Sequence, residues 1–510
     1  MLNPPYFFFN RGGVISTKQK SMNSEDQIAV TLIDNDLPEG WALPRISDLI
    51  EINYGKGLKE SDRKVGPVPV YGSNGVVGNH NASLSKGSAI IVGRKGSVGF
   101  VHFSLMPCWP IDTTYYIDKF NGLNPQFLMY ALRTLDLADL DTSTAIPGLN
   151  RNDVYMQKIP LPPLNEQKRI VAKVEELLTR VNATKERLAK VSLILKRFRQ
   201  AVLAAACSGR LTADWREKQP KLTSVNYSIQ GILQQREAEW LRTNGSSKKY
   251  KPPQDVKNNE LQELSKGWKY INSDALFSFI TSGSRGWAKH YATSGPIFIR
   301  VGNLDHDTIS LDLTEVQHVN PPAGQEKERT QVQLGDILIS ITADVGMVAL
   351  VRDEIGEAYV NQHVAIARPV TNVFKPYLAW YLASRKGGQI QFQDLQRGAT
   401  KVGLGLDDIG SVAIPFPPIE EQQEIVRRVE SMFKLADSVG KRVAAATARA
   451  EKLTQAILAK AFRGELVPTE AELARRECRS YETASQLLAC IKSDRKSKQA
   501  SQKVRRNRNL

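Results

Sequence analysis

The stretch IPLPPLNEQKRIVAKVEELL at 159–178 decides the fold of this chain, because it recurs as IPFPPIEEQQEIVRRVESMF at 414–433. The two copies lie 255 positions apart and are identical at ten of twenty positions. The register continues without an insertion to a second match, QAVLAAACSGRL at 200–211 against QAILAKAFRGEL at 455–466. A repeat this long indicates that half a chain has been duplicated, which differs from a solenoid of short units.

Each copy predicts a long amphipathic helix. Steps of alternately four and three residues from Ile170 and from Ile425 meet apolar side chains with one polar exception in each series. A sustained period of 3.5 residues is typical of a coiled coil. Two unrelated core helices are the alternative, but they would tolerate slippage that this gapless register does not show. The expected seam contains Ile170, Val174, Leu177, Val181, Leu188, Val191, Leu195, Phe198, Val202, Ile425, Val429, Met432, Val439, Val443, Leu453 and Ile457.

The ends of both helices carry recognisable signals. Prolines precede each helix or fall in its first turn, where a missing N–H costs nothing. Glu166 and Glu421 place negative charge near the helix N-terminus, where the helix dipole favours it. Gly209 and Gly464 stand where left-handed C-terminal caps are expected.

A globular unit precedes each helix, and the two units are related. LPEGW at 37–41 corresponds to LSKGW at 264–268, and the apolar run at 87–101 corresponds to the run at 335–350. Short Ile, Val and Leu runs bounded by Gly and Pro predict strands, and a proline-initiated helix is predicted near the end of each unit. The expected fold class is therefore mixed α+β, with two related domains separated by a long two-helix coiled coil.

These signals divide the chain into seven segments. The spacer helices are repeat 1 and repeat 2, and the linker between them is polar, with a helix expected near 228–242. The last twenty residues are strongly basic, which favours a solvated tail that contacts phosphates. The segments are an N-terminal extension (1–36), the first domain (37–158), the central spacer helix (159–212), the linker (213–263), the second domain (264–413), the distal spacer helix (414–467) and the basic C-terminal tail (468–510).

Composition restricts the partners and the compartment. The formal net charge of +16 favours polyanions as partners. No apolar stretch approaches the roughly 20 residues of a membrane span, so no membrane contact is expected. The four cysteines are scattered, which favours a reducing, cytoplasmic setting and gives no zinc-site spacing.

The sequence lacks the usual catalytic signatures. It contains no GxxxxGK[ST], HExxH, GxSxG or CxxC pattern. NPPY at 3–6 spells the tetrapeptide of adenine methyltransferases, but only two residues precede it and no cofactor-binding sheet can hold it. Glu166-Gln167-Lys168 imitates the end of a nuclease motif, yet the second copy ends in Gln423 and both stand at a helix start. We therefore expect no catalytic residue, no metal site and no cofactor in this chain.

The duplicated proline-box helix, the LPEGW opening and the AILAKAFRGEL ending resemble the specificity subunit of Type I restriction-modification systems, over about 37–467. The resemblance implies two target-recognition domains, each reading one half of an asymmetric, bipartite double-stranded DNA sequence. It also implies that the two helices pair antiparallel about a pseudo-two-fold axis and that their fixed length sets the gap between the half-sites.

The same resemblance implies a set of partners. Two modification subunits would bind the spacer and methylate adenine N6, and restriction subunits that translocate DNA would join them. Those partners are expected to use S-adenosylmethionine, ATP and Mg. Two other classes remain open: a coiled-coil scaffold that binds DNA or RNA outside restriction, and a self-sufficient methyltransferase or nuclease, which the missing motifs disfavour.

Reading DNA requires polar and basic side chains on loops that reach base edges. Any one candidate is as easily a phosphate anchor or a solvated side chain. In the first domain the candidates are Tyr54, Lys56, Lys59, Arg63, Lys64, Tyr71, Ser73, Asn74, Arg94 and Lys95. In the second domain they are Ser284, Arg285, Lys289, His290, Arg300, Asn303, Arg397, Thr400 and Lys401.

Overall fold

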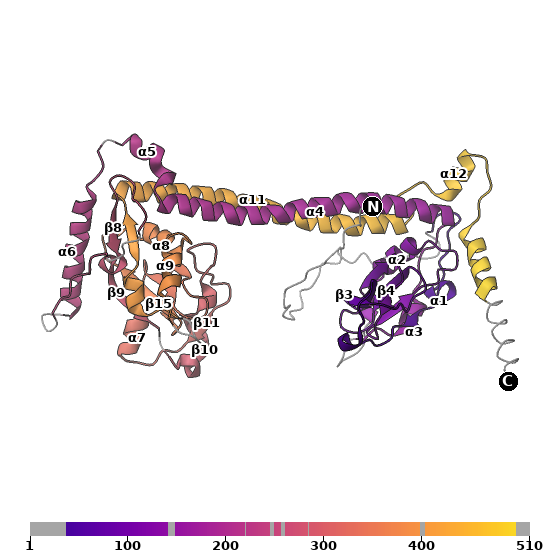
Figure 1. Ribbon diagram of the computed structural model, residues 1–510, viewed down its shortest axis with the longest axis horizontal. Coiled ribbons are helices and arrows are strands. Elements are labelled where there is room, and N and C mark those ends of the chain that lie inside the picture. Colours follow the sequence, from indigo (N-terminus) through magenta and orange to yellow (C-terminus); the bar gives the residue numbers. More distant parts are fainter. Residues whose placement is uncertain are drawn as a thin grey trace. The chain divides into compact units, whose positions relative to one another are not determined.

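The computed structural model divides the chain into two compact units (Figure 1). Unit 1 contains the described residues up to Glu186 and from Thr447 onward, and unit 2 contains Arg187–Ala446. Among the predicted residues, Ser284, Thr400 and Lys401 lie outside the described part, as do segment 1–36 and the end of the chain. The structure describes 37–140, 148–219, 221–244, 249–256, 261–283, 285–397 and 403–495.

Unit 1 holds the first domain, whose centre is an antiparallel sheet in the order β1-β7-β4-β5. β4 is AIIVG and is buried at every position, because both of its faces are covered. A second sheet has the order β3-β2-β6. The strands are β1 (Asn53–Tyr54), β2 (Val68–Gly72), β3 (Gly75–His80), β4 (Ala89–Gly93), β5 (Val101–Ser104), β6 (Trp109–Pro110) and β7 (Thr114–Ile117).

Short helices complete the first domain. Asn124 caps α2 by accepting from the N–H groups of Gln126 and Phe127, and Pro125 occupies the first helical turn. This is the proline-initiated helix that the sequence predicts. The helices are α1 (Ile46–Leu49), α2 (Pro125–Thr134) and α3 (Arg151–Met156), with 3₁₀ turns η2 (Glu60–Asp62) and η3 (Leu137–Leu140).

Unit 2 holds the second domain, with an antiparallel sheet in the order β13-β12-β15-β9 and smaller sheets β11-β10-β14 and β16-β8. Both domains are therefore mixed α and β, as predicted. The strands are β8 (Lys269–Asn272), β9 (Phe277–Ser282), β10 (Tyr291–Ile299), β11 (Gln317–Val319), β12 (Ile337–Ser340), β13 (Val348–Leu350), β14 (Ala358–Val360), β15 (Val364–Pro369) and β16 (Ala413–Phe416).

The helices of unit 2 surround these sheets. α8 is an apolar helix whose side chains from Tyr377 to Leu382 are all buried. The helices are α5 (Ala213–Glu217), α6 (Val225–Asn244), α7 (Gln325–Thr330), α8 (Lys375–Ala383), α9 (Gly388–Leu395) and α10 (Leu406–Gly410), with 3₁₀ turns η4 (Arg210–Thr212), η6 (Ser273–Leu276), η7 (Trp287–His290) and η8 (Val301–Asn303).

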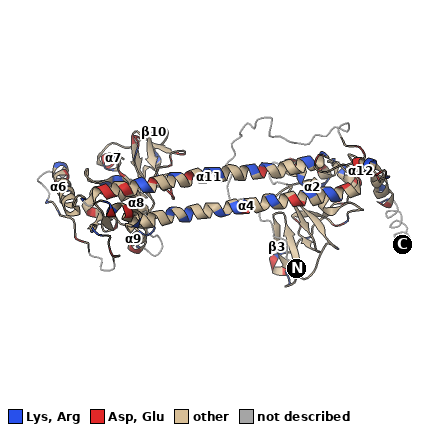
Figure 2. Ribbon diagram, turned by 90° about the horizontal axis from the view of Figure 1, so that it is seen from above, with Lys and Arg blue, Asp and Glu red and all other residues tan. Residues whose placement is uncertain are grey.

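The predicted long helices are α4 (Leu164–Cys207) and α11 (Ile419–Phe462), each of 44 residues, and each runs through both units. In unit 1 the early residue Val181 of α4 shares a core cluster with Ala450 and Ile457 of α11. In unit 2 the late residue Arg199 of α4 forms an ion pair with Asp437 of α11. Early positions of one helix thus meet late positions of the other, so the pairing is antiparallel within each unit. Figure 2 marks the positions of charged residues along the ribbons of both helices.

The helix ends agree with the sequence. Gly209 has φ 72° and Gly464 has φ 77°, the left-handed conformation expected of a C-terminal cap. A side chain would be strained at either position whatever space surrounds it.

Two positions of the expected seam are exposed. Leu453 is 52% exposed and Phe198 is 36% exposed, whereas Ala450 and Ile457 on either side of Leu453 are buried. Ile170, Val174, Val181, Val202, Ile425, Val429 and Ile457 are buried, and Leu177, Leu188, Val191, Leu195, Met432, Val439 and Val443 are half-buried.

A helical strap follows each long helix. After α4, Val225 and Ile232 of α6 enter the core of unit 2. After α11 come α12 (Glu470–Arg476) and a helical segment at 484–495, whose Leu487 and Ile491 enter the core of unit 1. The solvated tail is expected for the last twenty residues, of which the structure describes 491–495, and Ile491 among these is buried in that core.

Candidate nucleic-acid interface

A buried carboxylate joins the first domain to α4. The indole Nε1 of Trp41 donates to Oε1 of Glu166 over 3.0 Å, and the backbone N–H of Glu470 donates to the other oxygen over 2.8 Å. Beside it, Nε2 of Gln167 donates to the carbonyl of Pro162 over 2.9 Å. Glu166 and Gln167 are both fully buried. The LPEGW motif and the proline box thus form one joint.

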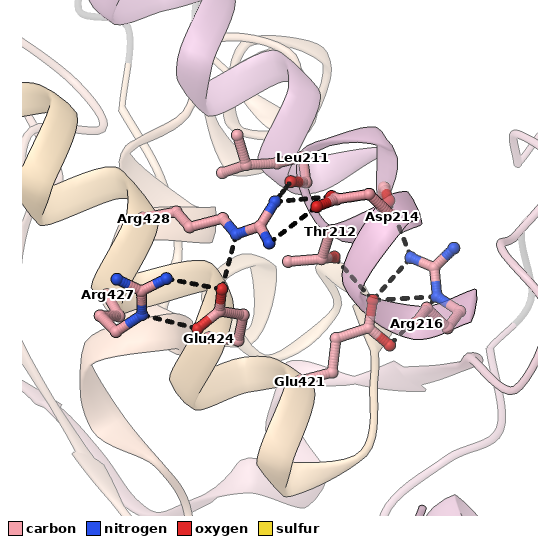
Figure 3. A network of polar contacts seen from close by, with 9 residues as sticks. Leu211, Thr212, Asp214, Arg216, Glu421, Glu424, Arg427 and Arg428 are labelled. Carbon is pink, nitrogen blue, oxygen red and sulfur yellow. Dashed lines mark hydrogen bonds and ion pairs between the residues drawn. The ribbon is translucent and has the colours of Figure 1, made fainter. Parts of the chain in front are cut away.

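The second domain repeats this joint at α11. Trp268 Nε1 donates to Glu421 over 2.9 Å, and the hydroxyl of Thr212 donates to the same carboxylate over 2.7 Å. Arg216 adds hydrogen bonds of 2.6, 3.0 and 3.3 Å, and Figure 3 shows this contact. The sequence placed Glu166 and Glu421 in the first helical turn, but it did not show that each carboxylate binds the tryptophan of its domain.

The two joints differ in charge balance. Arg216 neutralises Glu421 directly, whereas Arg169 pairs with Glu470 and leaves Glu166 with N–H donors. Burial raises the pKa of Glu166, and the hydrogen bonds from Glu470 and Trp41 oppose that shift only in part. A duplicated motif therefore holds its carboxylate with different partners in each copy.

Glu424 lies at the centre of a second network beside the unit 2 joint (Figure 3). Arg427 binds both of its oxygens at 2.7 and 2.8 Å, and Arg428 bridges Glu424 to Asp214. Hydrogen bonds from Arg427, and then from Arg428, lower the pKa of Glu424 to about 2. Asp214 lies in α5, which follows α4 in the chain. The network therefore ties α11 to the segment after α4.

The network predicts a specific acid sensitivity. A carboxyl with a lowered folded-state pKa stabilises the fold above its unfolded pKa of about 4.3, and this contribution is lost as pH falls toward 2. We expect the thermal midpoint of unit 2 in Glu424→Gln to fall less between pH 5 and pH 2.5 than that of the wild type. The corresponding difference in the free energy of unfolding should be on the order of 1 kcal/mol or less, because solvent screens the network.

The control for this prediction is Glu217→Gln, which changes an exposed carboxyl outside the network. Its thermal midpoint should follow that of the wild type over the whole pH range. Equal acid sensitivity of Glu424→Gln and the wild type would show that Glu424 adds nothing measurable to stability.

Three segments converge at one end of the main sheet in the first domain. The N–H of Gly55, after β1, donates to Thr114 O over 3.0 Å. The N–H of Leu149, before α3, donates to Arg94 O over 2.9 Å, and Lys95 bridges to Gly148. We call these segments, at 54–57, 93–99 and 148–151, the platform of the first domain.

The second domain has an equivalent platform at 282–283, 285–286, 340–346 and 403–406. Gly283 N–H donates to Val364 O over 3.1 Å, Leu404 N–H donates to Ile341 O over 2.9 Å, and Thr342 bridges to Gly403. A Cβ at Gly55 would lie 2.0 Å from the carbonyl oxygen of Ile111, and one at Gly283 would lie 2.1 Å from that of Asn361. Both positions therefore require glycine for the same reason.

The candidates of the first domain differ in exposure, and Tyr54, Lys56, Arg94 and Lys95 lie on the platform itself. Tyr71 is buried in an apolar cluster with Ala89, Ile91 and Cys108, so we remove it from the DNA-facing set. Arg63 donates to Val77 O over 2.7 Å and fastens its loop to the β3 strand. Tyr54, Lys56, Lys59, Lys64, Asn74 and Lys95 are exposed, and Arg63, Ser73 and Arg94 are half-buried.

In the second domain, Asn303 belongs to the interior of the fold. It is buried, its amide donates to the carbonyls of Asp312 and Glu315, and its oxygen accepts from the N–H of Arg300. Both N–H groups of its amide are therefore used by the fold. Arg397 pairs with Asp408 at 2.6 Å. Arg285, Lys289, Arg300 and Arg397 are exposed, and His290 is half-buried.

No described helix is long and apolar enough to cross a membrane. Within the described part of the chain, no group of three or more His, Cys, Asp and Glu residues could hold a metal ion.

Comparison with known proteins identifies the family. The sequence model of the Type I restriction modification DNA specificity domain matches 38–193 and 307–444, more than half of the chain. The EcoBI specificity subunit of Escherichia coli is 33% identical over 354 residues, which cover 68% of this chain and 66% of that subunit. The EcoKI specificity subunit of E. coli strain K12 is 28% identical over 469 residues, covering 84% and 90%.

A solved structure shares the fold. It is described as the structural basis of complex assembly and conformational transition of the type I R-M system, and it covers 84% of this chain and 99% of its own. The identity is 19% and the TM-score is 0.57, so this likeness concerns the fold alone. With the family match, the duplicated joints and the two platforms, the chain belongs to the Type I restriction modification DNA specificity domain family.

Proposed function

We propose that this chain is the subunit that selects the DNA sequence in a Type I restriction-modification complex and that catalysis resides in its partners. The observation that carries the proposal is the repeated platform: two domains share one backbone arrangement but present different side chains. A shared arrangement suits two equivalent encounters with duplex DNA, which is itself pseudo-two-fold. Different side chains suit a target whose two halves differ in sequence.

The exposed basic side chains near the platforms support contact with DNA. Lys56, Lys59, Lys64 and Lys95 of the first domain and Arg285 and Lys289 of the second can reach a polyanion. Lysine and arginine supply the phosphate contacts that give affinity, and side chains at base edges supply specificity. We expect most of these residues to position the duplex.

The long helices support the docking of partner proteins. Leu193 and Ile194 of α4 and Leu435 of α11 are 51%, 60% and 63% exposed. Large apolar side chains that stand exposed on otherwise polar helices suit a protein contact. We propose two modification subunits there, with restriction subunits joining them, and we assign S-adenosylmethionine, ATP and Mg to these partners. A helix of 44 residues is about 66 Å long and, in this proposal, sets the gap in the target.

Reconstitution tests the proposal. Purified alone, the chain is expected to transfer no labelled methyl group to DNA, to cut no DNA and to hydrolyse no ATP. Together with a Type I modification subunit it should direct adenine methylation to one bipartite sequence with unlike halves, read by methylome sequencing. Methyl transfer by the lone chain would contradict the division of labour, and sequence-independent DNA binding without directed methylation would favour the scaffold alternative.

A further inference from the structure

The platform of the first domain carries two arginines close to the ring of one exposed tyrosine. The guanidinium carbon of Arg94 lies 5.1 Å from the ring centre of Tyr54, and that of Arg151 lies 4.8 Å from the same centre. Tyr54 is 49% exposed and packs edge-on against Tyr115 at 5.1 Å. We call Arg94, Tyr54 and Arg151 the Arg–Tyr–Arg cluster. Arg151 stands at the start of α3 and carries no functional signal in the sequence.

Neither guanidinium is neutralised within the part of the chain that the structure describes. Arg94 donates to the carbonyl of Asp112 over 3.4 Å, and Arg151 donates to the carbonyl of Ile52 over 3.3 Å. No ion pair joins either of them to a described carboxylate. This distinguishes them from Arg397 of the second domain, which Asp408 holds at 2.6 Å. Two unpaired positive charges on one exposed ring therefore remain available to an anion or to base acceptors.

Ordered backbone holds all three residues. Tyr54 lies on β1 opposite Tyr115 of β7. The carbonyl of Arg94 accepts from the N–H of Leu149, and Arg151 follows Asn150, whose side chain caps α3. A planar guanidinium held against a ring loses little side-chain freedom when it binds, so the cluster is pre-organised for a ligand.

The second domain lacks this cluster. The same backbone hydrogen bonds make Ile341 the counterpart of Arg94 and Leu406 the counterpart of Arg151. The strand pairing places Ser282 where Tyr54 lies in the first domain. Two cations and an aromatic ring are thus replaced by two apolar side chains and a hydroxyl. If the cluster only supported a generic DNA contact, equivalent positions would be expected to keep equivalent charge.

We propose that the Arg–Tyr–Arg cluster reads guanine in the half-site of the first domain, an inference that rests on the proposed function. Arginine pairs with O6 and N7 of guanine through two parallel hydrogen bonds, the commonest specific contact in the major groove. The aromatic ring restrains both guanidiniums, and the absence of a described carboxylate leaves their donors for the base. The half-site of the second domain is read without this contact.

The test uses the complex with a modification subunit and four variants: Arg94→Lys, Arg151→Lys, Arg151→Ala and the control Arg45→Ala. Arg45 is an exposed arginine of the same domain outside the cluster. Its backbone N–H donates to the carboxylate of Asp48, and this hydrogen bond does not depend on the side chain that the substitution removes. Methylation rates are measured on the target and on targets with single base-pair changes in either half. We expect each cluster variant to methylate the target about 10- to 100-fold more slowly, the range of one lost bidentate contact.

The pattern of loss decides between base and backbone contact. Reading guanine predicts relaxed discrimination at one G·C pair in one half-site, an unchanged second half-site and no rescue by lysine. Uniform loss on all sequences, rescue by lysine and a smaller salt dependence would show phosphate contact and overturn the inference. Wild-type rates and motif in all cluster variants would overturn it as well.

Two further measurements separate the inference from the proposed function. If the wild-type complex shows no bipartite methylation motif, the proposed function itself fails. Circular dichroism and co-purification with the modification subunit identify any variant that does not fold, and Arg94→Lys and Arg151→Lys keep the charge and most of the side chain. Arg45→Ala should match the wild type in rate and motif.

Discussion

Exchange of residues 37–158 for the equivalent domain of a relative with another target is expected to replace one half of the methylated sequence and to leave the other half unchanged. The gap should also stay the same, because α4 and α11 are retained. The physical reason is that the first domain holds its own core and its own platform, so its contacts with DNA do not depend on the second domain. Methylome sequencing of a host that carries the exchanged subunit reads the result directly.

The structure sets a condition for this exchange. The incoming domain must present a tryptophan to Glu166 at the position of Trp41, and it must accept Arg495, which donates to the carbonyls of Ser47 and Ile50. A version that also exchanges 484–495 controls for a mismatched strap. The reciprocal exchange of 264–413 should change the other half alone. A single exchange that altered both halves, or neither, would refute independent reading by the two domains.

Val181→Asp should abolish assembly with the modification subunit and, with it, directed methylation. Val181 is 6% exposed and shares a core cluster with Ala450 and Ile457 of α11. An unpaired carboxylate there costs several kcal/mol unless the helices separate. We therefore expect the helix pair to open in unit 1 while the sheets keep their fold. Size-exclusion chromatography with the modification subunit and circular dichroism measure the two effects.

Thr184→Asp is the matched control for this variant. Thr184 lies on the same helix three residues further along and is exposed, so its carboxylate stays in water. Assembly and methylation should both persist. Val439→Asp should have a smaller effect than Val181→Asp because Val439 is half-buried. Full assembly and methylation by Val181→Asp would mean that the helix pair does not support partner binding.

The sequence by itself determined the duplication, both long helices and their ends. These features leave local signals: an apolar period of 3.5 residues, prolines before the first turn, and glycines where the backbone turns left-handed at Gly209 and Gly464. The family resemblance rests on the same segments, because a helix without insertions keeps its register between copies.

Tertiary structure alone decided how the domains join the helices and which side chains meet at the platforms. Trp41 and Glu166 are 125 residues apart, and neither motif by itself predicts the hydrogen bond between them. Insertions hid the equivalence of the platforms: Gly55 corresponds to Gly283 at an offset of 228, and Gly148 corresponds to Gly403 at 255. Because the offset between equivalent residues changes along the chain, one fixed offset does not align both platforms. The backbone hydrogen bonds identify the equivalent residues directly.

The same limit explains the individual residues. Tyr71 and Asn303 have side chains that suit DNA, but Tyr71 is buried with Ala89, Ile91 and Cys108, and Asn303 is buried and donates to the carbonyls of Asp312 and Glu315. Arg151 had no signal because its partner Tyr54 lies 97 positions earlier and meets it only when β1 and α3 pack together. Periodicity and caps are properties of neighbouring residues, which the sequence displays; exposure and side-chain contact depend on segments far apart, which only folding brings together.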